Sequence, residues 1–110
     1  MLNIMRDQCH QLAVDCGWWV EERNDGELIC LMHSELSEAM EGLRKDLQDP
    51  HVPERKNIDV ELADCIIRIL DFCGARGIDI AGAVSDKLDY NKTRADHRPE
   101  NRAKAGGKSF

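Results

Sequence analysis

Hydrophobic residues recur every three to four positions along most of the chain, which is the spacing of one buried helix face. The pattern predicts four helices, at residues 3–16, 26–47, 58–75 and 80–93. Pro50 and Pro53 exclude a regular helix from residues 48–56, which we expect to form a loop. The sequence therefore predicts an all-α fold.

The predicted helices carry residues that commonly begin or end a helix. Asn3 and Asp79 stand where the first and fourth helices begin, and their side chains can accept a hydrogen bond from a free backbone N–H. Gly17 should end the first helix, and the sequence Gly74-Ala-Arg-Gly77 should end the third.

The second predicted helix carries an apolar stripe that we expect to be buried. At roughly 100° per residue the stripe fills an arc of about 120°, and it consists of Leu28, Ile29, Met32, Leu36, Ala39, Met40, Leu43 and Leu47. Glu35 falls at the edge of this arc and should point partly inward, whereas Glu38 lies further round. A solvated face is the simpler interpretation for any single glutamate on this helix, and Glu35 is the exception.

The third predicted helix is apolar nearly all round, which is typical of the central helix of a bundle or of a dimer interface. Its polar residues fall within roughly 80° of each other on a helical wheel, and they are Glu61, Asp64, Arg68 and Asp71. Solvation alone could explain such a strip. On so apolar a helix, however, a narrow strip is more typical of a side that faces a polar cavity.

Two pairs of carboxylates are the candidate chemistry of the chain. Glu35 and Glu38 are one helical turn apart, as are Glu61 and Asp64, so each pair shares a helix face. If the two helices pack together, four carboxylates converge, and two of them at about 5 Å repel by roughly 3 kcal/mol at an effective dielectric of about 20. Divalent cations would cancel this repulsion, and magnesium prefers such oxygens. We therefore expect metal-assisted attack of water on a phosphoanhydride.

Basic residues near the end of the fourth predicted helix could neutralise the remaining phosphate charge, namely Lys87, Arg94 and Lys92. A di-iron bundle is the rival interpretation, but such sites normally need Glu-x-x-His on two helices. Here both motifs end in a carboxylate, and His33 precedes Glu35 by two positions, which is the wrong spacing. Ligation by oxygen atoms alone favours magnesium or manganese over iron.

Composition narrows the class of protein. The 110 residues suit one domain, 42% of them are hydrophobic, and the formal net charge is −6. That charge argues against a general nucleic-acid binder and against an anionic membrane surface. The five cysteines form no Cys-x-x-Cys pattern, so we expect buried free thiols in a reducing cytoplasm. No long apolar run and no signal peptide are evident.

Trp18 and Trp19 are unusual in a chain with 5% aromatic residues. They could plug the end of the bundle, or one of them could stack on a nucleobase.

An ordered set of segments resembles the MazG-like, all-α nucleoside triphosphate pyrophosphohydrolases. Nearly the whole chain takes part, and a lone Glu-x-x-Glu would be weak evidence. The segments are Gly17-Trp18-Trp19, His33-Ser-Glu-Leu-Ser-Glu-Ala39, Glu61-Leu-Ala-Asp64, Arg76-Gly-Ile-Asp79, Lys87-Leu-Asp-Tyr-Asn-Lys-Thr-Arg94 and Gly106-Gly-Lys-Ser-Phe110. One departure is the stretch from Arg98 to Lys104, where close relatives are shorter.

The resemblance implies a bundle of four or five helices in residues 1–95, followed by a polar tail at 96–110 that should be loose. It implies a dimer or a dimer of dimers with substrate pockets at or near the interface. It also implies that the phosphate chain of a nucleoside triphosphate is cleaved between the α- and β-phosphates.

The resemblance also assigns roles to residues. The implied magnesium ligands are Glu35, Glu38, Glu61 and Asp64. Contacts to phosphate or sugar are implied for Lys87, Asn91 and Arg94, and a position beside the base for Trp18 or Trp19.

Three functional hypotheses follow. The leading one is a pyrophosphohydrolase that uses Mg²⁺, or Mn²⁺, to convert a (d)NTP to the monophosphate and pyrophosphate. The second is a catalytically inactive nucleotide-binding or interaction module, to which the apolar third helix would suit equally well. The third is hydrolysis of a specialised pyrophosphate such as a phosphoribosyl-linked nucleotide.

Overall fold

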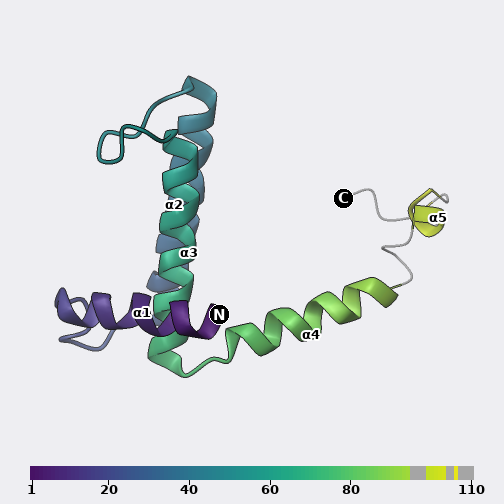
Figure 1. Cartoon of the computed structure of the whole chain (residues 1–110), viewed down its shortest axis with the longest axis horizontal. Helices are drawn as coiled ribbons and strands as arrows, with labels where there is room; N and C mark the ends of the chain where they lie inside the picture. The colour runs from purple at the N-terminus through teal and green to yellow at the C-terminus, as the bar shows by residue number, and fades with distance from the viewer. Residues whose placement is uncertain (95–98, 104–105, 107–110) are drawn as a thin grey trace. The chain divides into compact units, whose positions relative to one another are not determined.

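The structure is a computed structural model, and it describes residues 1–94, 99–103 and 106 (Figure 1). Within these residues every regular element is a helix, there is no strand, and one isolated β-bridge joins Gln48 to Lys56. The prediction of an all-α fold is confirmed. The chain divides into two units, Met1–Ile78 and Asp79–Phe110, and each is described by itself.

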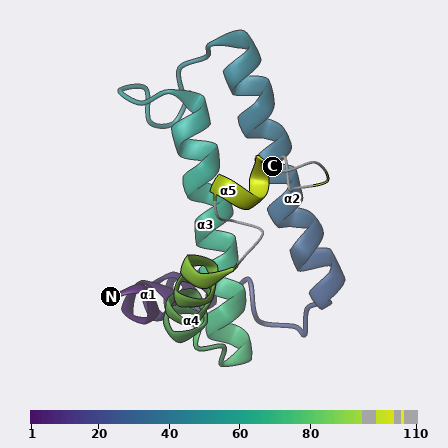
Figure 2. The same cartoon turned by 90° about the vertical axis from the view of Figure 1, so that its right-hand side faces the viewer.

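Two long helices, α2 (Asp25–Lys45) and α3 (Asn57–Arg76), form the framework of the first unit. They lie side by side and run in opposite directions (Figure 2). The side chain of Asn24 caps α2 by accepting a hydrogen bond from the backbone N–H of Glu27, 3.1 Å away. The helix bounds lie within two residues of those predicted, which is the usual uncertainty at helix ends.

α3 is the central helix of this unit, as its nearly continuous apolar surface predicts, because it packs against both α1 and α2. Leu70, the least exposed of its side chains, is 2% exposed. The helix ends at Gly77, whose φ of 66° is a left-handed conformation that glycine adopts without strain.

α1 (Leu2–Asp15) crosses α3 near the C-terminal end of that helix (Figure 1). Gly74 permits the close approach, because a Cβ atom there would lie 2.5 Å from the Cβ of His10. Gly17 follows the end of α1 with a φ of 88°, as predicted. The prediction that Asn3 caps α1 is wrong: the helix begins one residue earlier, Met1 is the N-cap, and no side chain caps it.

The second unit contains α4 (Ile80–Thr93), which has the predicted bounds. Asp79 caps it as predicted, since its side chain accepts a hydrogen bond of 2.9 Å from the backbone N–H of Gly82. A short helix, α5 (Pro99–Arg102), lies within the predicted tail. Residues 95–98, 104–105 and 107–110 lie outside the described part of the chain, so the division at residue 95 stays a prediction.

The core of the described chain is small. The buried apolar residues are Leu28, Ala39, Cys65, Leu70 and Cys73. The expectation of a wholly buried stripe on α2 is therefore wrong, because Leu36, Met40 and Leu43 are 47%, 60% and 59% exposed.

All five cysteines are free thiols. The prediction that they are buried is confirmed for Cys65 and Cys73, and it is wrong for Cys16 and Cys30, which are exposed. Across the described residues, no helix is both long enough and apolar enough to cross a membrane.

We expect Gly74→Ala to lower the free energy of unfolding by about 1–3 kcal/mol, because the added methyl group would press against His10 at the crossing of α1 and α3. Urea unfolding followed by circular dichroism measures this change. Gly26→Ala is the matched control, since its methyl group would meet only the side chain of Asn24, and alanine favours the helix. Equal stability of the two variants would contradict the close packing at Gly74.

Candidate metal centre

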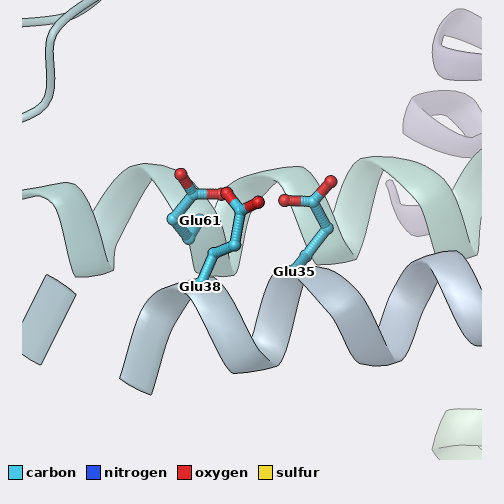
Figure 3. Close-up of side chains that lie close together, drawn as sticks. All are labelled: Glu35, Glu38 and Glu61. Atoms are coloured by element: carbon cyan, nitrogen blue, oxygen red, sulfur yellow. The ribbon is translucent and has the colours of Figure 1, made fainter. Parts of the chain in front are cut away.

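Three of the predicted carboxylates converge between α2 and α3. Each of Glu35, Glu38 and Glu61 offers an oxygen atom, and these atoms lie within 4.8 Å of one another. Figure 3 shows Glu35 and Glu38 rising from α2 and meeting Glu61, which comes from α3. The antiparallel packing of the two helices thus brings the two sequence motifs to one place.

The three side chains differ in burial and in partners. Glu35 is 8% exposed, and its Oε1 accepts a hydrogen bond of 2.9 Å from the Nε atom of Arg68. Glu61 is half-buried and accepts a hydrogen bond of 3.2 Å from the side-chain amide of Asn57. Glu38 is exposed. Glu35 and Glu61 are therefore each held by a hydrogen bond, and Glu38 is open to solvent.

Burial, together with the neighbouring carboxylates, raises the pKa of Glu61 to about 7. Burial is the largest cause, a hydrogen bond with Glu35 is the next, and the negative charges of Glu38 and Glu35 add to it. The hydrogen bond from Asn57 acts in the opposite direction. Within the described part of the chain, no positive group is among the causes of this shift, so the charged form of Glu61 is unfavourable. A cation beside Glu61 would stabilise that form.

Asp64, the fourth predicted ligand, lies outside this three-atom group. It is still close enough to sense the group: burial first, and the charge of Glu35 second, raise the pKa of Asp64, while Arg68 lowers it. Asp64 and Glu35 also line the same cavity. The structure therefore brings together three of the four predicted ligands and places the fourth beside them.

That cavity has a volume of about 550 Å³. Its polar lining residues are Glu35, Asp64, Arg68, Asp71 and Arg23, and its other lining residues are Leu12, Ala13, Cys16, Trp18, Leu31 and Ile67. Asp64, Arg68 and Asp71 of the polar strip on α3 line this cavity, while Glu61 belongs to the carboxylate group. The prediction that the strip faces a polar cavity is wrong in one respect, because most of the cavity surface is apolar.

The two tryptophans have different environments. Trp18 is 64% exposed and lies on the wall of the cavity. Trp19 is half-buried, and its indole N–H donates a hydrogen bond of 2.9 Å to Asp71, which His10 also contacts at 2.9 Å. Trp19 therefore ties the segment after α1 to α3, and Trp18 is the one that a ligand in the cavity could reach.

Two of the predicted phosphate-binding residues, Lys87 and Asn91, are four positions apart and share one face of α4, and the third, Arg94, is the C-cap of that helix. Tyr90 lies among them, with the Nζ of Lys87 4.6 Å and the guanidinium of Arg94 5.5 Å from its ring centre. The side-chain oxygen of Asn91 is buried and accepts no hydrogen bond within the described chain. These residues belong to the second unit and are brought together within it.

Sequence reasoning missed the partners of the carboxylates. Helical periodicity predicts Arg68 on the polar strip but not its hydrogen bond to Glu35, and it predicts no role for Asn57 or Asp49. Asp49 is 3% exposed although it lies in a loop. The available signal was its position beside Pro50, where an aspartate commonly accepts hydrogen bonds from the backbone of a turn.

Oxygen ligands in this arrangement suit a hard divalent cation such as Mg²⁺ or Mn²⁺, and the three-residue group contains no histidine or cysteine that would favour a softer metal. Comparisons of this chain with models of protein families, with curated proteins and with solved structures found no match.

We expect the metal-free protein to lose stability as the pH rises from 4.5 through about 7, because folded Glu61 holds its proton up to about 7 and the unfolded chain releases it near 4.5. The raised pKa of Asp64 acts in the same direction, and the lowered pKa values of Asp46 and Asp49 act below this range. Melting temperatures measured in EDTA across this range test the effect. Glu61→Gln should flatten the profile, and an equally steep profile in that variant would contradict the assignment.

Proposed function

We propose that this chain is a metal-dependent nucleoside triphosphate pyrophosphohydrolase of the MazG-like type. The single observation that carries the proposal is the convergence of Glu35, Glu38 and Glu61 from two helices. The reaction adds water to a (d)NTP and yields the nucleoside monophosphate and pyrophosphate. The resemblance of the sequence segments supports the choice of this reaction among those that use divalent cations.

The carboxylates would hold Mg²⁺, with Mn²⁺ as a substitute, through Glu35, Glu38 and Glu61, and Asp64 would complete the set from the cavity side. A cation bound there would lower the pKa of the attacking water and neutralise charge on phosphate oxygens. Glu38 is the ligand that is open to solvent, so this corner is where a phosphate chain can approach. The resemblance also implies that Lys87 and Arg94 bind phosphate, and the structure describes these two residues only within the second unit.

The cavity beside the carboxylates suits the nucleoside part of the substrate. Its volume of about 550 Å³ is within the range of small-molecule sites. Trp18 offers an exposed indole face on which a base can stack. Glu35 borders both the carboxylate group and the cavity, so a phosphate at the cations would leave its nucleoside close to Trp18.

We expect the protein to release pyrophosphate from at least one member of a panel of (d)NTPs and a phosphoribosyl-linked nucleotide when Mg²⁺ is present. Glu61→Gln should lower the rate by about 100-fold or more, because it removes an anionic ligand. A coupled pyrophosphate assay measures both rates, and circular dichroism checks that the variant remains helical.

The matched control is Glu41→Gln, one turn beyond Glu38 on α2, because Glu41 pairs with Arg44 and Lys45 and does not belong to the carboxylate group. It should keep the wild-type rate within about threefold. Tight nucleotide binding without product would favour the inactive binding module instead. No turnover of any substrate by the folded wild-type protein would end the proposal of an enzyme.

A homodimer, or a dimer of dimers, is the assembly that we propose, on the support of an exposed apolar surface. On α2, Leu36, Met40 and Leu43 lie within about 60° of each other at 100° per residue, and they are 47%, 60% and 59% exposed. Leu47, just beyond the helix, is 44% exposed. On α3, Leu62 and Ile66 are 43% and 51% exposed. So many large apolar side chains on two packed helices are typical of a surface that another chain covers.

We expect Met40→Glu to lower the sedimentation coefficient of the protein at micromolar concentration, because a charge in the centre of the apolar surface opposes its burial. Val20→Glu is the control, since Val20 is 83% exposed and lies in the turn after α1, away from that surface. A monomeric wild-type protein, or equal sedimentation of all three proteins, would contradict the proposed assembly.

A further inference from the structure

Asn57 joins a metal-ligand candidate to the loop that precedes it. Its side-chain nitrogen donates to Oε1 of Glu61 at 3.2 Å and to Oδ2 of Asp49 at 3.0 Å. A side-chain amide has two N–H groups, so both are used, one for each carboxylate. The amide also packs closely against α2, because a Cβ atom on Gly42 would lie 2.2 Å from the Oδ1 of Asn57.

Asp49 is in turn held by the loop itself. Its Oδ1 accepts hydrogen bonds of 2.9 Å from the backbone N–H groups of His51 and Val52. The backbone N–H of Asn57 donates to the carbonyl of Leu47 at 2.9 Å, which closes the base of the loop. Asp49 is 3% exposed, so its two oxygens have fixed partners and it cannot turn away from Asn57 without leaving them unpaired.

The hydrogen bond from Asn57 holds Oε1 of Glu61 in a fixed position. A carboxylate has about four acceptor sites, so this contact leaves Glu61 able to bind a cation. A glutamate without such a partner can rotate its carboxylate and loses orientation as a ligand. Asn57 carries no charge, so it orients Glu61 without competing electrostatically with the cation.

We propose that Asn57 is a positioning residue of the carboxylate group, and that it links cation binding at Glu61 to the conformation of the 48–56 loop through Asp49. The inference rests on the proposed function, because it requires a divalent cation at this group. Linkage makes the coupling reciprocal: a cation that orders Glu61 also stabilises the Asp49 turn.

The test is Mn²⁺ binding to the full chain, measured by electron paramagnetic resonance and by competition with Mg²⁺. Asn57→Ala should weaken Mn²⁺ binding by about 10- to 100-fold, the usual effect of removing a hydrogen bond to a ligand. Asn24→Ala is the matched control, because it removes an asparagine that caps α2 and lies about 20 Å along the helix from Glu38. It should lower the melting temperature and leave the Mn²⁺ affinity within about twofold.

Asp49→Asn gives a second variant that keeps the turn. Its amide oxygen still accepts from His51 and Val52, so its NH₂ group faces the NH₂ group of Asn57 and the two repel. We expect a loss of Mn²⁺ affinity that is smaller than in Asn57→Ala but above twofold. If Asn57→Ala does not fold, the Mn²⁺ affinity of Asp49→Asn tests the proposal instead.

Hydrogen exchange supplies a readout that a purely structural role would not change. Mg²⁺ should slow exchange of the His51 and Val52 amides in the wild-type protein and have no such effect in Asn57→Ala. Wild-type affinity in both variants, or Mg²⁺ protection that survives in Asn57→Ala, would overturn this inference and leave the proposed function intact. A wild-type protein that binds no Mn²⁺ would overturn both.

Discussion

Carboxylates repel one another, and the packing of α2 against α3 holds three of them within 4.8 Å. At about 5 Å each pair of charges costs roughly 3 kcal/mol at an effective dielectric of about 20. The fold offsets part of this cost: Arg68 pairs with Glu35, Asn57 donates to Glu61, and Glu61 keeps its proton up to a pKa of about 7. Helix packing therefore maintains a carboxylate repulsion that a divalent cation would relieve.

The packing of α2 against α3 also gives Glu35 two places: it is one of the three carboxylates, and it lines the cavity. Arg68 pairs with it from the cavity side. At the other end of the cavity, Asp71 fixes both His10 and Trp19, so α1 is tied to α3 close to the place where Trp18 is exposed. The carboxylate group and the largely apolar cavity thus share Glu35.

Helix positions and the inward orientation of Glu35 could be predicted because they follow from local periodicity and from spacing along one helix. The environment of the exposed face of α2 could not, because an apolar stripe has the same pattern whether its partner is in the same chain or in another. The cytoplasmic location, the absence of nucleic-acid binding and the family relationship stay predictions from the sequence.

The sequence by itself determined the helical class, the end of α3 at Gly77, the start of α4 at Asp79 and the two carboxylate motifs. Each of these features depends on residues within about two helical turns of one another. Only the tertiary structure decided that Glu61 meets Glu35 and Glu38 while Asp64 stands beside them, and that Asn57 ties Glu61 to Asp49. The register of α3 against α2 sets these distances, and close contacts such as Asn57 against Gly42 accompany it. Such contacts join residues that leave no periodic pattern along the chain.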